Sequence, residues 1–236
     1  LGALPGGSTN VFARTIGMTN DPIEATGELL AALGNGLGGI QRIGLGRAND
    51  RRFLFHVGVG FDAAVVSQVE KRSAVKKYLG HAFFAYCALR TWGFGYDRRH
   101  PHFRAVLETQ DGGTVEVEDG YFAILLNSSP YTYVGERPFN LSPGTDLTTP
   151  LTAVVLRSLG APTILGMAAG ALRTGPEDPP PRHRKVTQVP GVVAATITAR
   201  HTVPYQMDGE PLGDAAELRF VWEPDSLRLV MPGRSR

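Results

Sequence analysis

The sequence predicts an α+β protein that is mostly β, with an antiparallel β-sandwich towards its C-terminus. Two observations carry this prediction. Short apolar segments separated by turn signals fill the chain after about residue 103, which is typical of a sandwich or barrel. Helical spacing is confined to a few segments, and two of them precede a glycine cluster at Gly34–Gly39. We place a domain boundary at that cluster.

Both helices and strands are expected in the first hundred residues. Val11–Ile16 and Pro22–Leu33 have apolar residues at helical spacing, and the glycine cluster ends the second helix. Ile40–Leu45 and Arg52–Val59 are expected to be strands. Ser73–Trp92 is expected to be a longer helix, because its apolar residues share one broad face.

The remaining segments are expected to be strands, apart from one short helix at Pro162–Leu172. A hairpin is indicated by Asp111-Gly112-Gly113 between two alternating segments. The predicted strands are Phe103–Thr109, Thr114–Glu118, Tyr121–Leu126, Leu151–Leu156, Lys185–Val189, Ala194–Arg200, Val203–Met207, Glu217–Trp222 and Ser226–Val230.

Composition excludes several classes of protein. The 236 residues include 42% hydrophobic residues, enough for a core, and the net charge of +2 gives no basic stripe for nucleic acid. The single cysteine, Cys87, excludes an intrachain disulfide framework and fits a reducing cytoplasm. No apolar run approaches the roughly 20 residues of a membrane span, and no signal peptide is evident.

A glycine-rich motif, Leu4–Arg14, runs into the first predicted helix. Pro5 ends a preceding strand, and Gly6 and Gly7 let a ligand approach bare backbone. Three good N-cap residues follow, namely Ser8, Thr9 and Asn10. A helix N-terminus with free N–H groups binds anions, so the motif indicates a phosphate site. The alternative interpretation is an ordinary capped turn between a strand and a helix.

A second motif, Met207–Glu210, presents two carboxylates, Asp208 and Glu210, on a tight turn. A carboxylate within hydrogen-bond reach of a hydroxyl can act as a general base. The alternative interpretation is a common hairpin turn between two strands. A phosphate site together with a presented carboxylate indicates phosphoryl transfer to a hydroxyl.

These two motifs, together with Val59–Ala63 between them and a last strand that ends at Pro232, resemble the diacylglycerol kinase catalytic-domain family. The resemblance covers nearly the whole chain. It is to the soluble bacterial lipid kinases, which are similar to sphingosine and ceramide kinases.

The resemblance implies a two-domain kinase with its active site in the cleft between the domains. Residues 1–38 would be a remnant of the N-terminal α/β nucleotide-binding domain, to which the last strand, residues 226–236, would return. Residues 39–225 would be the β-sandwich domain, which carries part of the lipid site.

The resemblance also implies roles for individual residues. The segment from Gly6 to Asn10 would line the nucleotide phosphates, and Glu210 would be the general base for the lipid hydroxyl. Asp208 would be an acidic residue of the same catalytic motif, and Asp62 would lie near the cleft. The implied cofactors are ATP and Mg²⁺. The implied partner is a membrane lipid with a free hydroxyl, met by a cytoplasmic protein at the inner face of the membrane.

Three departures from the family pattern matter. The family's Gly-Gly-Asp-Gly-Thr loop is absent and would be expected upstream of Leu1. Val11 stands where the family often has an aspartate. Thr148–Pro150 replaces an Asp-Asp-Gly turn that helps to bind a structural magnesium, although Asp146 is close, so a metal site stays open.

We therefore expect a truncated lipid kinase that is inactive alone, with apolar faces of Leu1–Leu33 left without a partner. One alternative is a catalytically inactive lipid- or partner-binding module. A third, weaker hypothesis is a soluble kinase related to the NAD kinases. The sequence leaves the lipid and the oligomeric state open.

Overall fold

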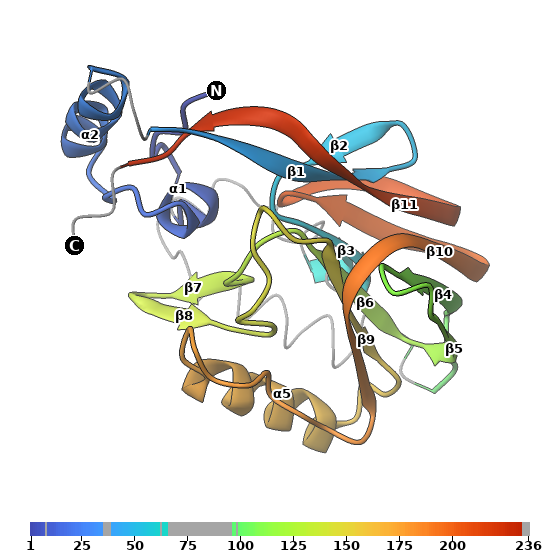
Figure 1. The fold of residues 1–236 in the computed structure, drawn as a ribbon. Helices are drawn as coiled ribbons and strands as arrows, with labels where there is room; N and C mark the ends of the chain where they lie inside the picture. Colours follow the sequence, from blue (N-terminus) through green and yellow to red (C-terminus); the bar gives the residue numbers. More distant parts are fainter. Residues whose placement is uncertain (8, 35–38, 62, 66–95, 98, 233–236) are drawn as a thin grey trace.

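The computed structural model describes residues 1–7, 9–34, 39–61, 63–65, 96–97 and 99–232 (Figure 1). The helices in this part are α1 (Val11–Thr15), α2 (Pro22–Gly34) and α5 (Ala161–Arg173). The strands are β1 (Ile40–Ala48), β2 (Arg51–Phe53), β3 (His56–Gly60), β4 (Phe103–Thr109), β5 (Thr114–Gly120), β6 (Phe122–Leu126), β7 (Thr132–Val134), β8 (Arg137–Phe139), β9 (Leu151–Leu156), β10 (Val186–Met207) and β11 (Glu210–Val230). The predicted mostly-β class is confirmed.

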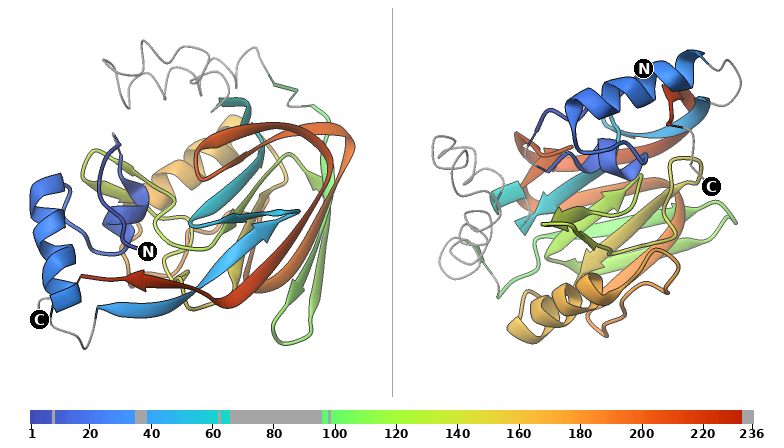
Figure 2. Two further views of the ribbon diagram at one scale, coloured as in Figure 1. Left: turned by 90° about the horizontal axis from the view of Figure 1, so that it is seen from above. Right: turned by 90° about the vertical axis from the view of Figure 1, so that its left-hand side faces the viewer.

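Nine of the described strands form one antiparallel sheet that folds over on itself. The long strand β10 makes this possible, because it pairs with β9 from Val186 to Val192 and with β3 from Tyr205 to Met207. Strands β6 and β9 complete the ring, and β11, β1 and β2 extend the sheet beyond it. The predicted sandwich is not confirmed, since the strands belong to one continuous sheet. Figure 2 shows this curled sheet from two sides.

The main core lies inside the folded sheet. Alternating residues of β4 point into it, and Phe103 and Leu107 are completely buried. Helix α5 covers the outer face of β6 and β9 through Met167 and Ala171. Both faces of these two strands are therefore buried, which explains why their sequences are continuous apolar runs.

The N-terminal segment packs against the ends of β1 and β11. Its buried residues Ala13, Ile16, Met18 and Ala25 contact a cluster that includes Ile43, Leu45 and Leu229. Leu1 also joins the edge of β11, because its ammonium donates to the carbonyl of Arg228 and its carbonyl accepts from the N–H of Val230.

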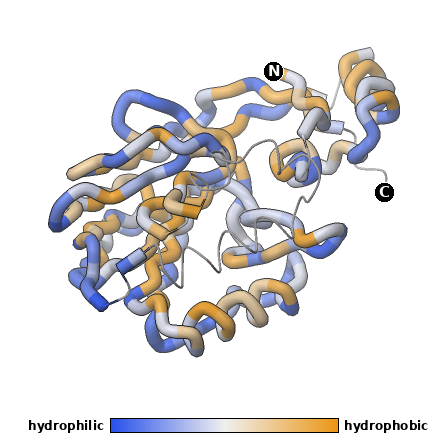
Figure 3. The backbone as a smooth tube through the Cα atoms, turned by 180° about the vertical axis from the view of Figure 1, so that it is seen from behind, coloured by the Kyte–Doolittle hydropathy of each residue, from blue (hydrophilic) through white to orange (hydrophobic). Residues whose placement is uncertain are grey.

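Helix α2 of this segment packs on the sheet with one side, and its other side is exposed to solvent. Three apolar residues of α2 face solvent, with exposed fractions of 83% for Ile23, 64% for Leu30 and 49% for Leu33. Figure 3 shows this N-terminal helix at the margin of the molecule, with hydrophobic and hydrophilic positions along it. The expectation of unpartnered apolar faces is met by this side of α2, while the opposite side has a partner in the sheet.

Several predicted boundaries change. The single strand predicted over Arg52–Val59 is two strands, separated by Leu54 and Phe55. The three segments predicted between Lys185 and Met207 form the one strand β10, and the two predicted after Glu217 form part of β11. The small hairpin of β7 and β8 was not predicted. The helix predicted over Ser73–Trp92, with Cys87, lies outside the described residues.

Glycine at position 120 is required by packing rather than by backbone conformation. A Cβ there would lie 2.1 Å from a ring carbon of Phe103, which is completely buried. We therefore expect Gly120→Ala to lower the free energy of unfolding by about 1–3 kcal/mol, the usual effect of overpacking. Denaturant titration measures this change.

Gly27→Ala is the control, because Gly27 is exposed within α2 with open space around it. This variant should raise the free energy of unfolding by about 0.5–1 kcal/mol. Equal stability of the two variants would contradict this packing.

Candidate functional site

The turn between β10 and β11 consists of two residues, Asp208 and Gly209. Met207 and Glu210 form the last pair before it. Both turn residues have left-handed backbone, with φ of 50° at Asp208 and 87° at Gly209. Asp-Gly is a favoured pair for this type of hairpin turn, because both positions need positive φ. The local sequence thus specifies the turn.

The carboxylate of Asp208 is turned into the protein and holds the connection between β2 and β3. It accepts hydrogen bonds from the backbone N–H groups of Leu54 at 2.7 Å, Phe55 at 3.0 Å and His56 at 3.1 Å. Burial raises the pKa of this carboxyl, and the nearby charge of Glu210 also raises it, while the three N–H groups act in the opposite direction. Asp208 therefore fixes the turn to the rest of the sheet.

Asn127 supports the same connection from the other side. It follows β6, and its amide nitrogen donates to the carbonyls of Leu54 at 2.9 Å and Gly44 at 3.0 Å. Its backbone N–H donates to the carbonyl of Phe55. The sequence predicted no role for Asn127. Its position directly after a buried strand was the one feature of the sequence that could have indicated a functional residue. The connection between β2 and β3 is thus held by two polar side chains, the buried Asn127 and the half-buried Asp208.

Glu210 lies at the first position of β11 and is exposed. It belongs to none of the ion pairs found among the described residues. The two carboxylates of the motif are therefore different in kind. Asp208 is committed to backbone N–H groups, and Glu210 is open to solvent.

The glycine-rich motif forms a small closed loop before α1. The N–H groups of Gly6 and Gly7 both donate to the side-chain oxygen of Asn10, at 3.0 and 2.7 Å. The side-chain nitrogen of Asn10 donates to Asn20 at 2.7 Å. The backbone of Asn10 is left-handed, with φ of 48°. The loop shape is therefore set by one asparagine.

Helix α1 differs from the expectation in two respects. Asn10 is its N-cap residue but makes no capping hydrogen bond to it, because the side chain points back to the glycines. The helix has only five residues, so few peptide dipoles add up at its N-terminus. Donors to an anion would thus come from the glycine loop rather than from a helix dipole.

A continuous set of contacts joins the glycine-rich segment to the Asp208 turn. Arg14 of α1 lies 3.6 Å from the ring centroid of Tyr133 and pairs with Glu136 at 2.9 Å, both in the β7–β8 hairpin. Tyr131, just before β7, contacts the ring of His56 at 4.7 Å between centroids. The backbone of His56 binds Asp208. In Figures 1 and 2 the β10–β11 turn lies at the end of the sheet that faces α1.

Other predicted site residues are placed as follows. Thr9 is half-buried beside Asn10. Ser8 and Asp62 lie outside the described residues. The carboxylate of Asp146 accepts from both the N–H and the hydroxyl of Thr148. Within the described ranges no three His, Cys, Asp or Glu side chains are grouped as metal ligands.

No protein-family model and no curated protein matches the chain. Solved structures do match. One is a "putative diacylglycerol kinase" from Bacillus anthracis str. Sterne, with a TM-score of 0.68, 18% identity and coverage of 99% of this chain and 68% of that chain. A diacylglycerol kinase from the same strain matches with a TM-score of 0.61, 16% identity and coverage of 99% and 67%. A further structure from that strain, again called a "putative diacylglycerol kinase", matches with a TM-score of 0.66 and 18% identity. The match covers 98% of this chain and 69% of that chain.

The chain shares the fold of these diacylglycerol kinases. The resemblance drawn from the motifs is thereby confirmed at the level of the fold. None of the helices in the described ranges has the length and hydropathy needed to cross a bilayer.

His56 gives a pH-dependent prediction. Burial lowers its pKa from 6.5 to about 3, so the folded state keeps the ring neutral. In the unfolded chain the His56 ring takes up a proton below about pH 6.5, whereas in the folded state it stays neutral. The stability that the neutral, buried ring contributes is therefore present above about pH 6.5 and is lost as the pH falls towards 3. We expect His56→Leu to remove that part of the acid sensitivity, on the order of 2 kcal/mol near pH 4.5.

Denaturant titrations of both proteins between about pH 7 and pH 4 measure this difference. His201→Gln is the control, because His201 is exposed, and its acid sensitivity should equal that of the wild type. Parallel stability curves for the His56→Leu variant and the wild type would show that His56 is not buried as a neutral ring.

Proposed function

We propose that this chain is the larger part of an ATP-dependent lipid kinase that transfers the γ-phosphate of ATP to the hydroxyl of a diacylglycerol-like lipid. One observation supports this most directly. The Asp208–Glu210 turn is fastened to the sheet by one carboxylate and leaves the other exposed. The fold shared with diacylglycerol kinases supplies the context for this geometry.

In the proposed reaction Glu210 is the general base. It accepts the proton of the lipid hydroxyl as that oxygen bonds to the γ-phosphorus, and the bond from phosphorus to the bridging oxygen breaks to release ADP. Such a step depends mainly on positioning and charge neutralisation, and a positioned base contributes to it. Magnesium enters with ATP as part of the substrate.

Asp208 is a positioning residue in this proposal. Its carboxylate is occupied by the N–H groups of Leu54, Phe55 and His56, so it is not free to accept a proton from substrate. By fastening the turn it fixes the backbone from which Glu210 projects, which keeps the base in place without a contact of its own to the lipid.

The glycine loop would meet the phosphates of ATP. A Cβ on Gly6 would have no atom within 4 Å, so packing within the described residues does not explain this glycine. Close approach of a ligand would explain it. The N–H groups of Gly6 and Gly7 now donate to Asn10, and a phosphate would take the place of that side-chain oxygen.

A second candidate is a catalytically inactive binding module. Its supporting observation is the same pair of hydrogen bonds, because donors satisfied by Asn10 need no phosphate. A third candidate, a soluble kinase similar to the NAD kinases, differs from the proposed lipid kinase only in the molecule that accepts the phosphate. The measurements below separate these candidates.

For the base, Glu210→Gln in the natural full-length protein should lower kcat for lipid phosphorylation by about 10²–10⁴-fold, because the amide cannot accept the proton. ATP affinity and the unfolding transition should stay unchanged. Glu108→Gln, an exposed glutamate on β4, is the matched control and should keep full activity. Near-normal turnover by Glu210→Gln would remove Glu210 from this role, and a wild type without turnover on lipids or NAD would favour the binding module.

For the loop, Gly6→Val should weaken ATP binding by about tenfold or more, because the branched side chain blocks approach to the backbone. Stability should be unchanged, since the space beside Gly6 is open. Calorimetric titration of ATP measures the first effect and denaturant titration the second. ATP affinity that survives the substitution would return the loop to a purely structural role.

A further inference from the structure

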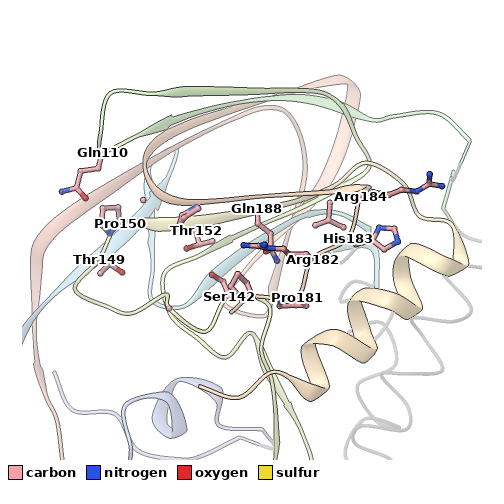
Figure 4. A pocket seen from close by; sticks show the side chains of 15 residues that line it. Gln110, Ser142, Thr149, Pro150, Thr152, Pro181, Arg182, His183, Arg184 and Gln188 are labelled. Carbon is pink, nitrogen blue, oxygen red and sulfur yellow. The ribbon is translucent and has the colours of Figure 1, made fainter. Parts of the chain in front are cut away.

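A pocket of about 920 Å³ lies away from the residues proposed for the reaction. Four segments enclose it: the turn after β4 at Gln110, the segment before β9, the proline-rich loop before β10, and the first part of β10 (Figure 4). Its volume is in the range of small-molecule sites. Neither the glycine loop nor the β10–β11 turn contributes to its walls.

The chemistry of the walls is cationic. Arg182, His183 and Arg184 line the pocket, and no acidic residue does. Arg182 extends across the pocket towards Ser142 and Gln188, whereas Arg184 points away from its centre (Figure 4). The ion pairs found among the described residues do not include Arg182. The guanidinium that spans the pocket is therefore available to a ligand.

The cationic loop is held in place by close packing on α5. A Cβ on Gly170 would lie 2.7 Å from the Cβ of Pro181, and a Cβ on Gly166 would lie 3.4 Å from the ring of His183. These glycines are four residues apart and thus share one face of the helix. Three successive prolines, residues 179–181, stiffen the approach to Arg182. The base of Arg182 is thereby fixed relative to the pocket.

Polar groups line the opposite wall. Ser142 and Thr152 are buried, and both hydroxyls bond to the hydroxyl of Thr145, at 3.0 and 2.7 Å. On the loop, Nδ1 of His183 accepts from the N–H of Lys185 at 3.2 Å. A neutral His183 ring therefore carries its proton on Nε2, which makes that nitrogen a donor.

We propose that this pocket binds a phosphate group, carried either by a small soluble molecule or by the headgroup of an anionic phospholipid. A guanidinium, an imidazole N–H and hydroxyl groups are the side chains that recognise phosphate oxygens, and arginine does so with two parallel hydrogen bonds. The site is separate from Glu210 and holds a second ligand beside the substrates of the proposed reaction.

Two probes test this in the protein without any activity assay. Glycerol 3-phosphate is titrated by calorimetry, and binding to phosphatidylcholine vesicles with and without phosphatidylglycerol is measured by co-sedimentation. We expect the wild type to bind at least one phosphate-bearing probe. Arg182→Gln should weaken that binding about tenfold or more, the effect of one lost charge-assisted interaction. Arg184→Gln should weaken it less, because that side chain points away from the pocket centre.

Arg51→Gln is the control for net charge, since Arg51 is exposed on β2, outside the pocket. It should bind both probes like the wild type. Binding of glycerol 3-phosphate alone identifies a soluble ligand, and binding of phosphatidylglycerol vesicles alone identifies a lipid headgroup. Equal losses in the Arg182→Gln and Arg51→Gln variants, or no binding of either probe by the wild type, would overturn the proposal. Because the readout is binding, neither result depends on Glu210.

Discussion

The proposed site depends on the inward-turned carboxylate of the half-buried Asp208. Three backbone N–H groups converge on its two oxygens. A carboxylate taken out of water is costly unless it is hydrogen-bonded, so the turn and the β2–β3 connection stabilise each other. Without this interaction the tip of the longest hairpin would be free to move. With it, Glu210 projects from a fixed point.

The long strands carry that fixed point to the N-terminal segment. β10 and β11 extend over 22 and 21 residues, and the far end of β11 forms a cluster with α1 and α2 through Leu229. The same hairpin contacts this segment a second time through His56, Tyr131 and the β7–β8 hairpin, which holds Arg14. The glycine loop and the Asp208 turn are therefore parts of one packed structure, although about 200 residues of sequence separate them.

Local patterns predicted most of the elements, since β4, β9, α2 and α5 each have an unbroken period or apolar run. Tertiary contacts decided the rest. The break between β2 and β3 exists because Asp208, some 150 residues later, captures the intervening N–H groups. The continuity of β10 follows from partners on both of its edges. In the site, the motifs identified Asp208 and Glu210 but could not show that one carboxylate is bound to backbone N–H groups and the other is exposed. The motif likewise does not predict that the side chain of Asn10 closes the glycine loop, because this contact depends on the fold of the loop.

Amide hydrogen exchange in Asp208→Asn tests the central claim most directly. An amide side chain has one acceptor oxygen and an NH₂ group that only donates, so at least one of the three N–H groups loses its acceptor. The account predicts faster exchange at the amides of Leu54, Phe55 and His56 and unchanged exchange in β4 and β9. Asp225→Asn is the control, because Asp225 also lies in a left-handed turn conformation. Unchanged protection at Leu54–His56 in the Asp208→Asn variant would contradict the claim that this carboxylate holds the site together.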